Sequence, residues 1–192
     1  MAQSHALAYP DPAAHDHLLL VDEEDRVVGT EEKLLAHRQG VLHRAFSVMI
    51  YDDADRWLLQ RRAPVKYHSA GLWTNACCGH PRPGEDTKDA ASRRLREELS
   101  FTCPLTFLTK IRYRSELDQG LTEHELVSVF MGRHQGEVRP NPDEADRVRW
   151  IDARDLRLEL ERNAADFTVW FRKYVDELWA PLAAGPSALE RP

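Results

Sequence analysis

The sequence has few cysteines, no long apolar run and no excess of positive charge, and each absence excludes a class of protein. Three cysteines in 192 residues do not make the disulfide framework of a small secreted domain. No stretch approaches the roughly 18 apolar residues of a membrane-spanning helix, and the first residues lack the basic start and apolar run of a signal peptide. A formal net charge of -6 disfavours non-specific nucleic-acid binding. We therefore expect a cytoplasmic protein that binds neither nucleic acid nor membrane.

The length of the chain suits one domain with a sizeable hydrophobic core. Residues 1–16 and 183–192 are rich in small, polar and proline residues, which predicts a flexible tail at each end. Residues 17–182 then form the single folded domain. The sequence contains no internal repeat.

Several segments have the composition and spacing of β-strands. Residues 17–22 and 26–30 flank a charged turn and predict an N-terminal hairpin. Residues 46–62 predict a second hairpin, with Asp52 to Asp55 as its turn. Three further strands are expected over residues 106–114, 123–134 and 147–151.

Two segments have helical patterns. Asp86 can cap a helix that runs to residue 100, with a narrow apolar stripe of Ala90, Ala91, Leu95 and Leu99. Residues 166–179 predict an amphipathic helix that packs on a sheet through Phe167, Trp170, Phe171, Tyr174, Val175 and Leu178. This order of elements predicts an α+β fold, a mixed β-sheet flanked by helices, with the first hairpin as an N-terminal extension.

A first group of residues has the chemistry of a metal site, namely His37, His43, His80, Glu123 and Glu125. On a strand, the two glutamates share a face with Val127 and Val129, so both carboxylates can point inward. Inward carboxylates repel each other unless a cation or a proton lies between them. Three imidazoles and two carboxylates suit Mn²⁺, Mg²⁺ or Zn²⁺. Taken singly, each histidine is more often an ordinary surface or core residue.

A second group resembles the Nudix box, in which a loop leads into a helix whose carboxylates hold divalent cations against a diphosphate. The positions that fit are Gly79, Glu85, Arg93, Leu95, Glu97 and Glu98. Arg94 stands where the box has a glutamate, and Ser100 where it has a glycine. The arginine should weaken multi-metal hydrolysis and supply a cation for phosphate oxygens. The alternative is a solvated helix face with ion pairs between successive turns.

Two smaller groups complete the candidates. Arg61, Arg62 and Lys66 follow a predicted strand and can fork around a phosphate, or they simply belong to a solvated loop. Cys77 and Cys78 lie in an apolar strand-like run, so one should face inward and the other away. A free cysteine is usually just a small buried hydrophobic residue, and Tyr113 and Trp170 would by default belong to the core.

Six ordered strings together resemble type 1 isopentenyl diphosphate isomerase: L-H-R-A-F-S-V (42–48), R-R-A (61–63), L-W-T-N-A-C-C-G-H-P (72–81), Y-R (113–114), E-H-E (123–125) and F-T-V-W-F (167–171). The match runs from about residue 17 to residue 180. The resemblance implies a Nudix-type fold and an enzyme that interconverts isopentenyl and dimethylallyl diphosphate by moving a double bond.

The resemblance also implies a role for each candidate residue. Cys78 and Glu125 act on opposite sides of the substrate, flanked by Tyr113 and Trp170. His37, His43, His80, Glu123 and Glu125 hold the protein-bound metal, and Glu98 binds a Mg²⁺ that arrives with the diphosphate. The diphosphate itself is bound by Lys33, Arg62, Lys66 and Arg94. We expect no flavin, and a monomer or a homodimer.

The chemistry fits this assignment. Protonating an alkene gives a tertiary carbocation that water would capture, so the pocket must be dry, with a proton donor and an acceptor two carbons apart. We expect Glu125 with Tyr113 to donate to isopentenyl diphosphate and Cys78 to accept. The chain departs from the family where only five residues separate His37 from His43, and at Val169, where proline is frequent. The alternatives are a Nudix hydrolase of a nucleoside diphosphate derivative and a non-catalytic prenyl diphosphate sensor.

Overall fold

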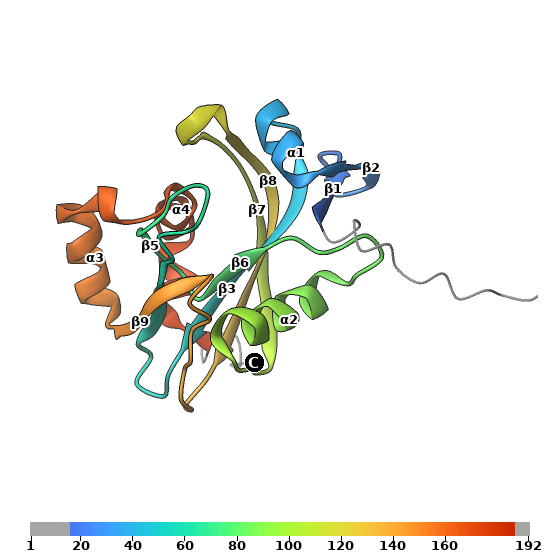
Figure 1. Ribbon diagram of the computed structural model, residues 1–192. Coiled ribbons are helices and arrows are strands. Elements are labelled where there is room, and N and C mark those ends of the chain that lie inside the picture. The colour runs from blue at the N-terminus through green and yellow to red at the C-terminus, as the bar shows by residue number, and fades with distance from the viewer. Residues whose placement is uncertain (1–15, 187–192) are drawn as a thin grey trace, which may run out of the picture.

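A mixed sheet of nine strands organises the computed structural model, which describes residues 16–186 (Figure 1). Most of the two expected tails, residues 1–15 and 187–192, therefore lies outside the described part of the chain. No helix of the described residues is long and apolar enough to cross a membrane.

The N-terminal hairpin is confirmed. Strands β1 (His17–Val21) and β2 (Val27–Glu32) pair antiparallel. Strand β1 also meets β3 (His43–Tyr51) where Leu20 pairs with His43, so the hairpin extends the main sheet.

The second predicted hairpin is confirmed at its turn, with antiparallel pairing that is limited to the residues next to the turn. Strand β3 meets β4 (Trp57–Arg62) only where Tyr51 pairs with Trp57. The Asp52 carboxylate accepts the backbone N–H groups of residues 54 and 56, each at 2.9 Å, and closes the turn. Beyond it the strands diverge, because each finds other partners further along the chain.

Strand β3 has a parallel partner, β8 (Thr122–Arg133), and an antiparallel one, β6 (Cys77–Gly79). Strand β7 (Leu105–Glu116) pairs antiparallel with β8. On the other branch, β4 pairs with β5 (Trp73–Thr74) and β9 (Ala145–Ile151). Because β3 and β4 separate after the turn, β6 can pair with the middle of β3.

Helix α2 (Thr87–Leu99) covers one face of the sheet and begins as predicted. The Asp86 side chain accepts the N–H groups of residues 88 and 89 at 2.8 and 3.2 Å. Its apolar stripe is buried against Phe46, Val48 and Ile50, which alternate along β3. Each buried leucine, valine, isoleucine or phenylalanine in this contact stabilises the fold by about 1.5–3 kcal/mol.

Helix α4 (Val169–Ala184) covers the opposite face, with α3 (Ala153–Arg162) beside it (Figure 1). Phe167 is buried as expected but precedes the helix, in an extended segment that bridges to Trp73. The helix bends at Leu178, whose φ of -118° is not helical, three residues before Pro181. It also continues through Ala184, two residues into the expected tail.

A short helix, α1 (Lys33–Gln39), was not foreseen. Glu32 caps it by accepting the N–H groups of residues 34 and 35 at 2.9 and 2.8 Å, and Gly40 ends it with a φ of 62°. This left-handed conformation favours glycine. The helix places Lys33 and His37 on one face, a turn apart.

Candidate active site

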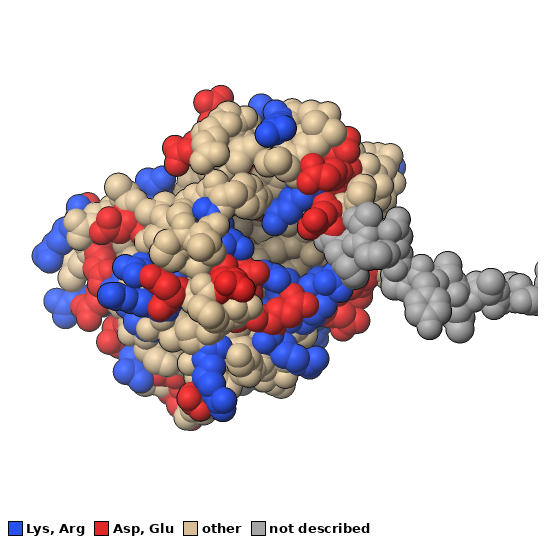
Figure 2. Space-filling view, in the orientation of Figure 1, with Lys and Arg blue, Asp and Glu red and all other residues tan. Residues whose placement is uncertain are grey.

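A cavity of about 370 Å³ opens between α2, α4 and the loop that follows β4. Figure 2 shows a hollow on this side of the molecule with acidic and basic side chains around it. Its lining includes twelve of the residues expected in the site: Lys33, His37, Arg62, Lys66, Cys78, His80, Arg94, Glu98, Tyr113, Glu123, Glu125 and Trp170. The remaining one, His43, is fully buried behind them.

Four side chains suited to a metal ion converge in this region. The ligand atoms of His37, His43, His80 and Glu125 lie within 4.8 Å of one another. Sheet register places them, because His43 on β3 pairs directly with Glu125 on β8. Glu123, on the same face of β8, has its Oε2 3.5 Å from His37 Nε2. The shorter spacing between His37 and His43 therefore does not keep His37 out of the cluster.

The donor set fits a divalent cation. The Nδ1 atoms of His37 and His43 lie 2.7 and 2.9 Å from backbone carbonyl oxygens, to which Nδ1–H donates, so each Nε2 keeps a free lone pair. Within the described residues, His43 Nε2 and Glu123 Oε2 are buried and have no hydrogen-bond partner. Buried polar atoms are rarely left so, and a cation would satisfy both.

The pKa shifts in the cluster also favour a bound cation. Burial, then the charge of Glu125, raise the pKa of the Glu123 carboxyl. Burial opposes ionisation of Glu125 too, but the imidazoles of His43 and His80 hold its pKa well below the usual range. Burial lowers the pKa of His80 to about 3, so its imidazole is neutral, as a metal ligand must be. A second carboxylate oxygen of Glu125 accepts the Tyr113 hydroxyl at 2.8 Å.

The two adjacent cysteines face opposite sides of the sheet, as alternation predicts. Cys77 is fully buried among the residues packed on α2, and its thiol lies 3.5 Å from Glu98 Oε1. Cys78 faces the α4 side and the cavity. Cys77 therefore packs on the α2 side of the sheet and does not line the cavity, although its thiol contacts the carboxylate expected to bind the second metal ion.

Cys78 sits on a buried polar network that the sequence reasoning missed. Its Sγ lies 3.3 Å from Asn75 Oδ1 and 3.5 Å from Ser47 Oγ. The Asn75 amide donates to Ser47 Oγ at 2.9 Å, so the Ser47 hydroxyl proton is free to point at the sulfur. Burial raises the pKa of the Cys78 thiol to about 12, although both hydrogen bonds oppose this.

The same network fixes Trp170. Its indole N–H donates to Thr74 Oγ1 at 2.9 Å, and the Thr74 hydroxyl donates to Asn75 Oδ1 at 3.1 Å. The guanidinium of Arg62 lies 5.2 Å from the Trp170 ring centre. The sequence signal for this network was the polar pair Thr74-Asn75, two residues upstream of Cys77. A hydroxyl and an amide in an otherwise apolar segment need hydrogen-bond partners when they are buried.

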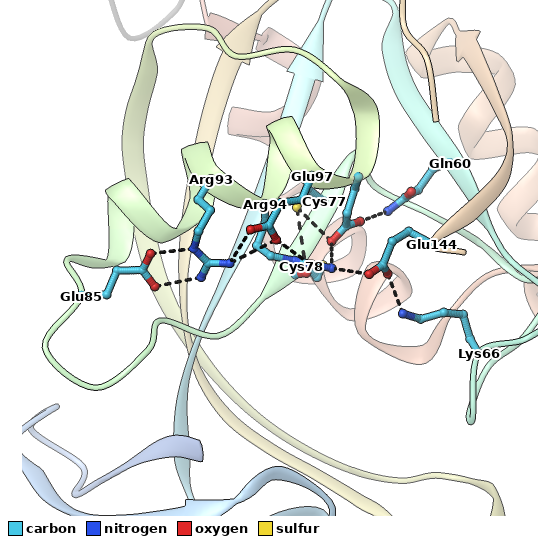
Figure 3. Close-up of polar contacts among 10 residues, drawn as sticks. Gln60, Lys66, Cys77, Cys78, Glu85, Arg93, Arg94, Glu97 and Glu144 are labelled. Carbon is cyan, nitrogen blue, oxygen red and sulfur yellow. Dashed lines mark hydrogen bonds and ion pairs between the residues drawn. The ribbon is translucent and has the colours of Figure 1, made fainter. Parts of the chain in front are cut away.

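The four cations expected to bind the diphosphate border the cavity in two kinds of environment. Lys66 Nζ lies 2.6 Å from Glu144 Oε2, and Arg94 donates to Glu144 Oε1 at 3.0 Å (Figure 3). Lys33 and Arg62 have no carboxylate partner among the described residues, although Arg62 donates to a backbone carbonyl at 3.1 Å. The latter pair is therefore free to bind an anion.

Arg61 does not join these cations. It pairs through two hydrogen bonds with Asp146 on β9 and does not line the cavity. Successive side chains on a strand point to opposite faces, so Arg61 and Arg62 on β4 could not both reach the phosphate site. The sequence reasoning also missed other lining residues, namely Gln60, Tyr67, His68, Glu144 and Tyr174.

The loop before α2 is held by the Nudix-box pair Glu85 and Arg93. Arg93 donates to both carboxylate oxygens at 2.7 and 2.8 Å, and this hydrogen bonding lowers the pKa of Glu85 below its usual value of 4.5. Glu85 also accepts the backbone N–H of Arg82 at 2.9 Å. The carboxylate thus closes the loop that carries His80 toward the helix.

Replacing Glu85 with glutamine is expected to lower the free energy of unfolding by about 1–2 kcal/mol at neutral pH. A carboxyl whose pKa is lowered by folding stabilises the native state above its unfolded pKa and loses this effect as pH falls through the folded pKa. The gap between wild type and Glu85→Gln should therefore narrow below about pH 4.5. Urea unfolding across this range measures it, with the more exposed Glu97→Gln as control. A constant gap would contradict the ionic explanation.

Comparison with known proteins decides the family. The NUDIX domain model matches residues 41–171. Isopentenyl-diphosphate Delta-isomerase 1 of Aromatoleum aromaticum is 48% identical over 165 residues, covering 86% of this chain and 93% of that protein. The isopentenyl-diphosphate Delta-isomerase of Burkholderia multivorans is 46% identical, with 87% and 95% covered. The chain belongs to the type 1 isopentenyl-diphosphate Delta-isomerases of the Nudix superfamily.

Solved structures agree on the fold of this isomerase family member. A crystal structure of a Deinococcus radiodurans protein superposes with a TM-score of 0.64 at 24% identity, covering 78% of this chain and 89% of that one. The MutT protein from Methanosarcina mazei gives a TM-score of 0.59 at 20% identity, with 71% and 91% covered. The expected α+β Nudix fold, a mixed sheet flanked by helices, is thereby confirmed.

Proposed function

We propose that this protein interconverts isopentenyl diphosphate and dimethylallyl diphosphate, the activity that the names of its isomerase relatives state. The observation that carries the proposal is that one cavity is lined by a thiol, Cys78, a carboxylate, Glu125, and an indole, Trp170. These are the groups needed to add a proton at one carbon, remove one two carbons away and stabilise the cation between.

The substrate's hydrocarbon end would lie between Cys78 and Glu125. For isopentenyl diphosphate, the hydrogen-bonded pair of Tyr113 and Glu125 delivers a proton to the terminal carbon, which leaves a tertiary cation on the next carbon. Because Glu125 is ionised, this proton is the one that the Tyr113 hydroxyl carries. The Cys78 sulfur then takes a proton from the following carbon, and the double bond forms there. In the reverse direction the thiol donates. The sulfur must therefore enter the forward reaction as thiolate. Burial disfavours that form, since it raises the pKa of the thiol to about 12, and the Ser47 hydroxyl is placed to oppose this by stabilising the thiolate.

Trp170 serves the intermediate. Its indole lines the cavity, is buried and is fixed through Thr74, so it needs no reorganisation. A desolvated cation over an indole gains about 2 kcal/mol. Tyr113, Trp170 and Tyr174 together exclude water, which would otherwise capture the cation.

The His/Glu cluster is the proposed metal site. The residues that would hold the ion are His37, His43, His80, Glu123 and Glu125, and Mn²⁺, Mg²⁺ or Zn²⁺ all suit this donor set. A bound divalent cation would supply positive charge that stabilises the anionic forms of its neighbours. We assign Glu98 to a second ion, a Mg²⁺ that accompanies the diphosphate, and Lys33, Arg62, Lys66 and Arg94 to the diphosphate oxygens.

The carboxylates of the Nudix-like helix favour isomerisation over hydrolysis. Glu98 is the member of this helix whose carboxylate lines the cavity, whereas Glu97 pairs with Arg93 and Arg94 at 3.2 and 2.8 Å. Glu85 is occupied by Arg93. A hydrolase that assembles several metal ions on such a motif would need all three carboxylates. The proposed isomerase needs only Glu98, which Arg94 contacts at 2.7 Å and would have to share with the ion.

Incubation with isopentenyl diphosphate and Mg²⁺, followed by NMR, tests the proposal. We expect the allylic product, and a large loss of it with Glu125→Gln. Release of phosphate or monophosphate without allylic product would instead support the hydrolase. An unchanged biological function with both Cys78→Ala and Glu125→Gln would support the sensor. The cytoplasmic location, the oligomeric state and the independence from flavin remain predictions of the sequence.

A further inference from the structure

Glu144 lies between two of the four cations assigned to the diphosphate, Lys66 and Arg94. Figure 3 shows its carboxylate between Lys66, on the loop after β4, and Arg94, on α2. The two carboxylate oxygens are divided between them, with Oε2 2.6 Å from Lys66 Nζ and Oε1 3.0 Å from Arg94. A carboxylate that bridges two cations in this way occupies a position that a phosphate group would take.

Glu144 leaves the local charge balanced before any substrate enters. Arg94 also contacts Glu98 Oε1 at 2.7 Å and Glu97, which it shares with Arg93, at 2.8 Å. Lys66 and Arg94 thus face three carboxylates, of which Glu144 and Glu98 line the cavity. Although burial opposes it, the hydrogen bond from Lys66 and the charge of Arg94 keep the pKa of Glu144 below its usual value, and the group is ionised at neutral pH. Among the described residues that line the cavity, a bare diphosphate would meet cations without a carboxylate partner at Lys33, Arg62 and Arg82.

We propose that Glu144 makes the pocket select diphosphate complexed with a divalent cation over the bare anion. The inference rests on the proposed function, because it assumes that this pocket binds a diphosphate. A divalent cation that arrives with the diphosphate adds the positive charge that Glu144 and Glu98 have cancelled. Without that cation, the two carboxylates repel the incoming phosphate oxygens at close range in a half-buried site.

In the alternative, Glu144 only holds Lys66 and Arg94 in position. The contacts of these two residues give this alternative less support. Arg94 keeps its contacts to Glu97 and Glu98 at 2.8 and 2.7 Å when Glu144 is neutralised. The backbone of Lys66 is fixed independently, because its N–H donates to the carbonyl of Ala63 at 3.1 Å. Removing the Glu144 charge should therefore relieve repulsion more than it disturbs position.

Calorimetric titration with inorganic diphosphate tests this inference. The measured quantity is the ratio of the Kd in buffer without divalent cations to the Kd with Mg²⁺. We expect Glu144→Gln to lower this ratio at least about threefold through tighter binding of the bare anion. Glu144→Asp, which keeps the charge, and Glu97→Gln, which contacts the same arginine outside the cavity, should keep the ratio of the wild type.

Circular dichroism and thermal melts confirm that each variant is folded before titration. The proposed selectivity is overturned if the ratio of the two Kd values falls less than threefold in Glu144→Gln, or if it rises. It is also overturned if Glu97→Gln lowers this ratio as much as Glu144→Gln does. If the wild type isomerises isopentenyl diphosphate in that case, the proposed function stands and this inference alone fails. If inorganic diphosphate does not bind even with Mg²⁺, this inference and the diphosphate assignment both fail.

Discussion

Replacing Cys78 with alanine is expected to lower kcat for isomerisation by roughly 10²–10⁴-fold, the usual contribution of a positioned proton-transfer group. The thiol is the group on its side of the cavity that can exchange a proton with carbon, since its neighbours Asn75 and Thr74 do not titrate. Cys78→Ser should fall almost as far, because a hydroxyl is a much weaker acid. The assay follows allylic product by NMR, with KM determined separately.

Cys77→Ala is the matched control. The residue lies one position away on the same strand but packs on α2, so kcat should stay within about threefold of the wild type. Its loss removes a small buried side chain and a weak contact to Glu98, at a cost of about 1 kcal/mol in the free energy of unfolding. Equal losses of kcat from both cysteine variants would show that the thiol does not act through the face assigned to it.

Exhaustive chelation is expected to abolish turnover, and added Mn²⁺, Mg²⁺ or Zn²⁺ to restore it. Within the described residues, His43 Nε2 and Glu123 Oε2 are buried without a hydrogen-bond partner, and a bound cation would satisfy both. Ligand binding to the native state also stabilises it, so the chelated protein should melt at a lower temperature than the reloaded one. Full activity after chelation would refute the metal site.

Comparing His80→Ala with His124→Ala tests whether His80 is a metal ligand, because His124 is a nearby histidine outside the cluster. His124 lies on β8 between the two glutamates, but its Nδ1 is 3.0 Å from the carbonyl of Gly40, outside the cluster. Elemental analysis of purified protein should find the metal reduced at least about tenfold in His80→Ala and retained in His124→Ala. Loss of metal from both variants would mean that the cluster depends on the strand rather than on the assigned ligand.

Local signals predicted those parts of the fold that local physics determines. The Asp86 cap, the apolar stripe of α2 and the first hairpin follow from residues close in sequence. Helix α1 has only seven residues, too few for a periodic pattern, and it is fixed by the Glu32 cap and by packing. The partners of β3 could not be predicted, because β6 and β8 come from distant parts of the chain.

The sequence likewise predicted one part of the candidate site and missed another. The resemblance identified the residues that the structure gathers around the cavity, including His37 despite its unusual spacing. Glu144 escaped because it lies in a polar loop, N-P-D-E-A, with no periodicity of its own. Its proposed role depends on Lys66 and Arg94, which lie next to it only in the folded structure. Asn75 was quoted within a string but gained a role only when its partners were known.

The parallel pairing of β3 with β8 has a kinetic consequence. His43 meets Glu125 across that pair, while His37 and His80 arrive from α1 and the end of β6. Pairings between segments so far apart form late, because the chain must first close long loops. The metal ligands are therefore scattered until the sheet is nearly complete, and the ion cannot act as an early nucleus for folding. We expect added metal to slow unfolding while leaving the refolding rate nearly unchanged.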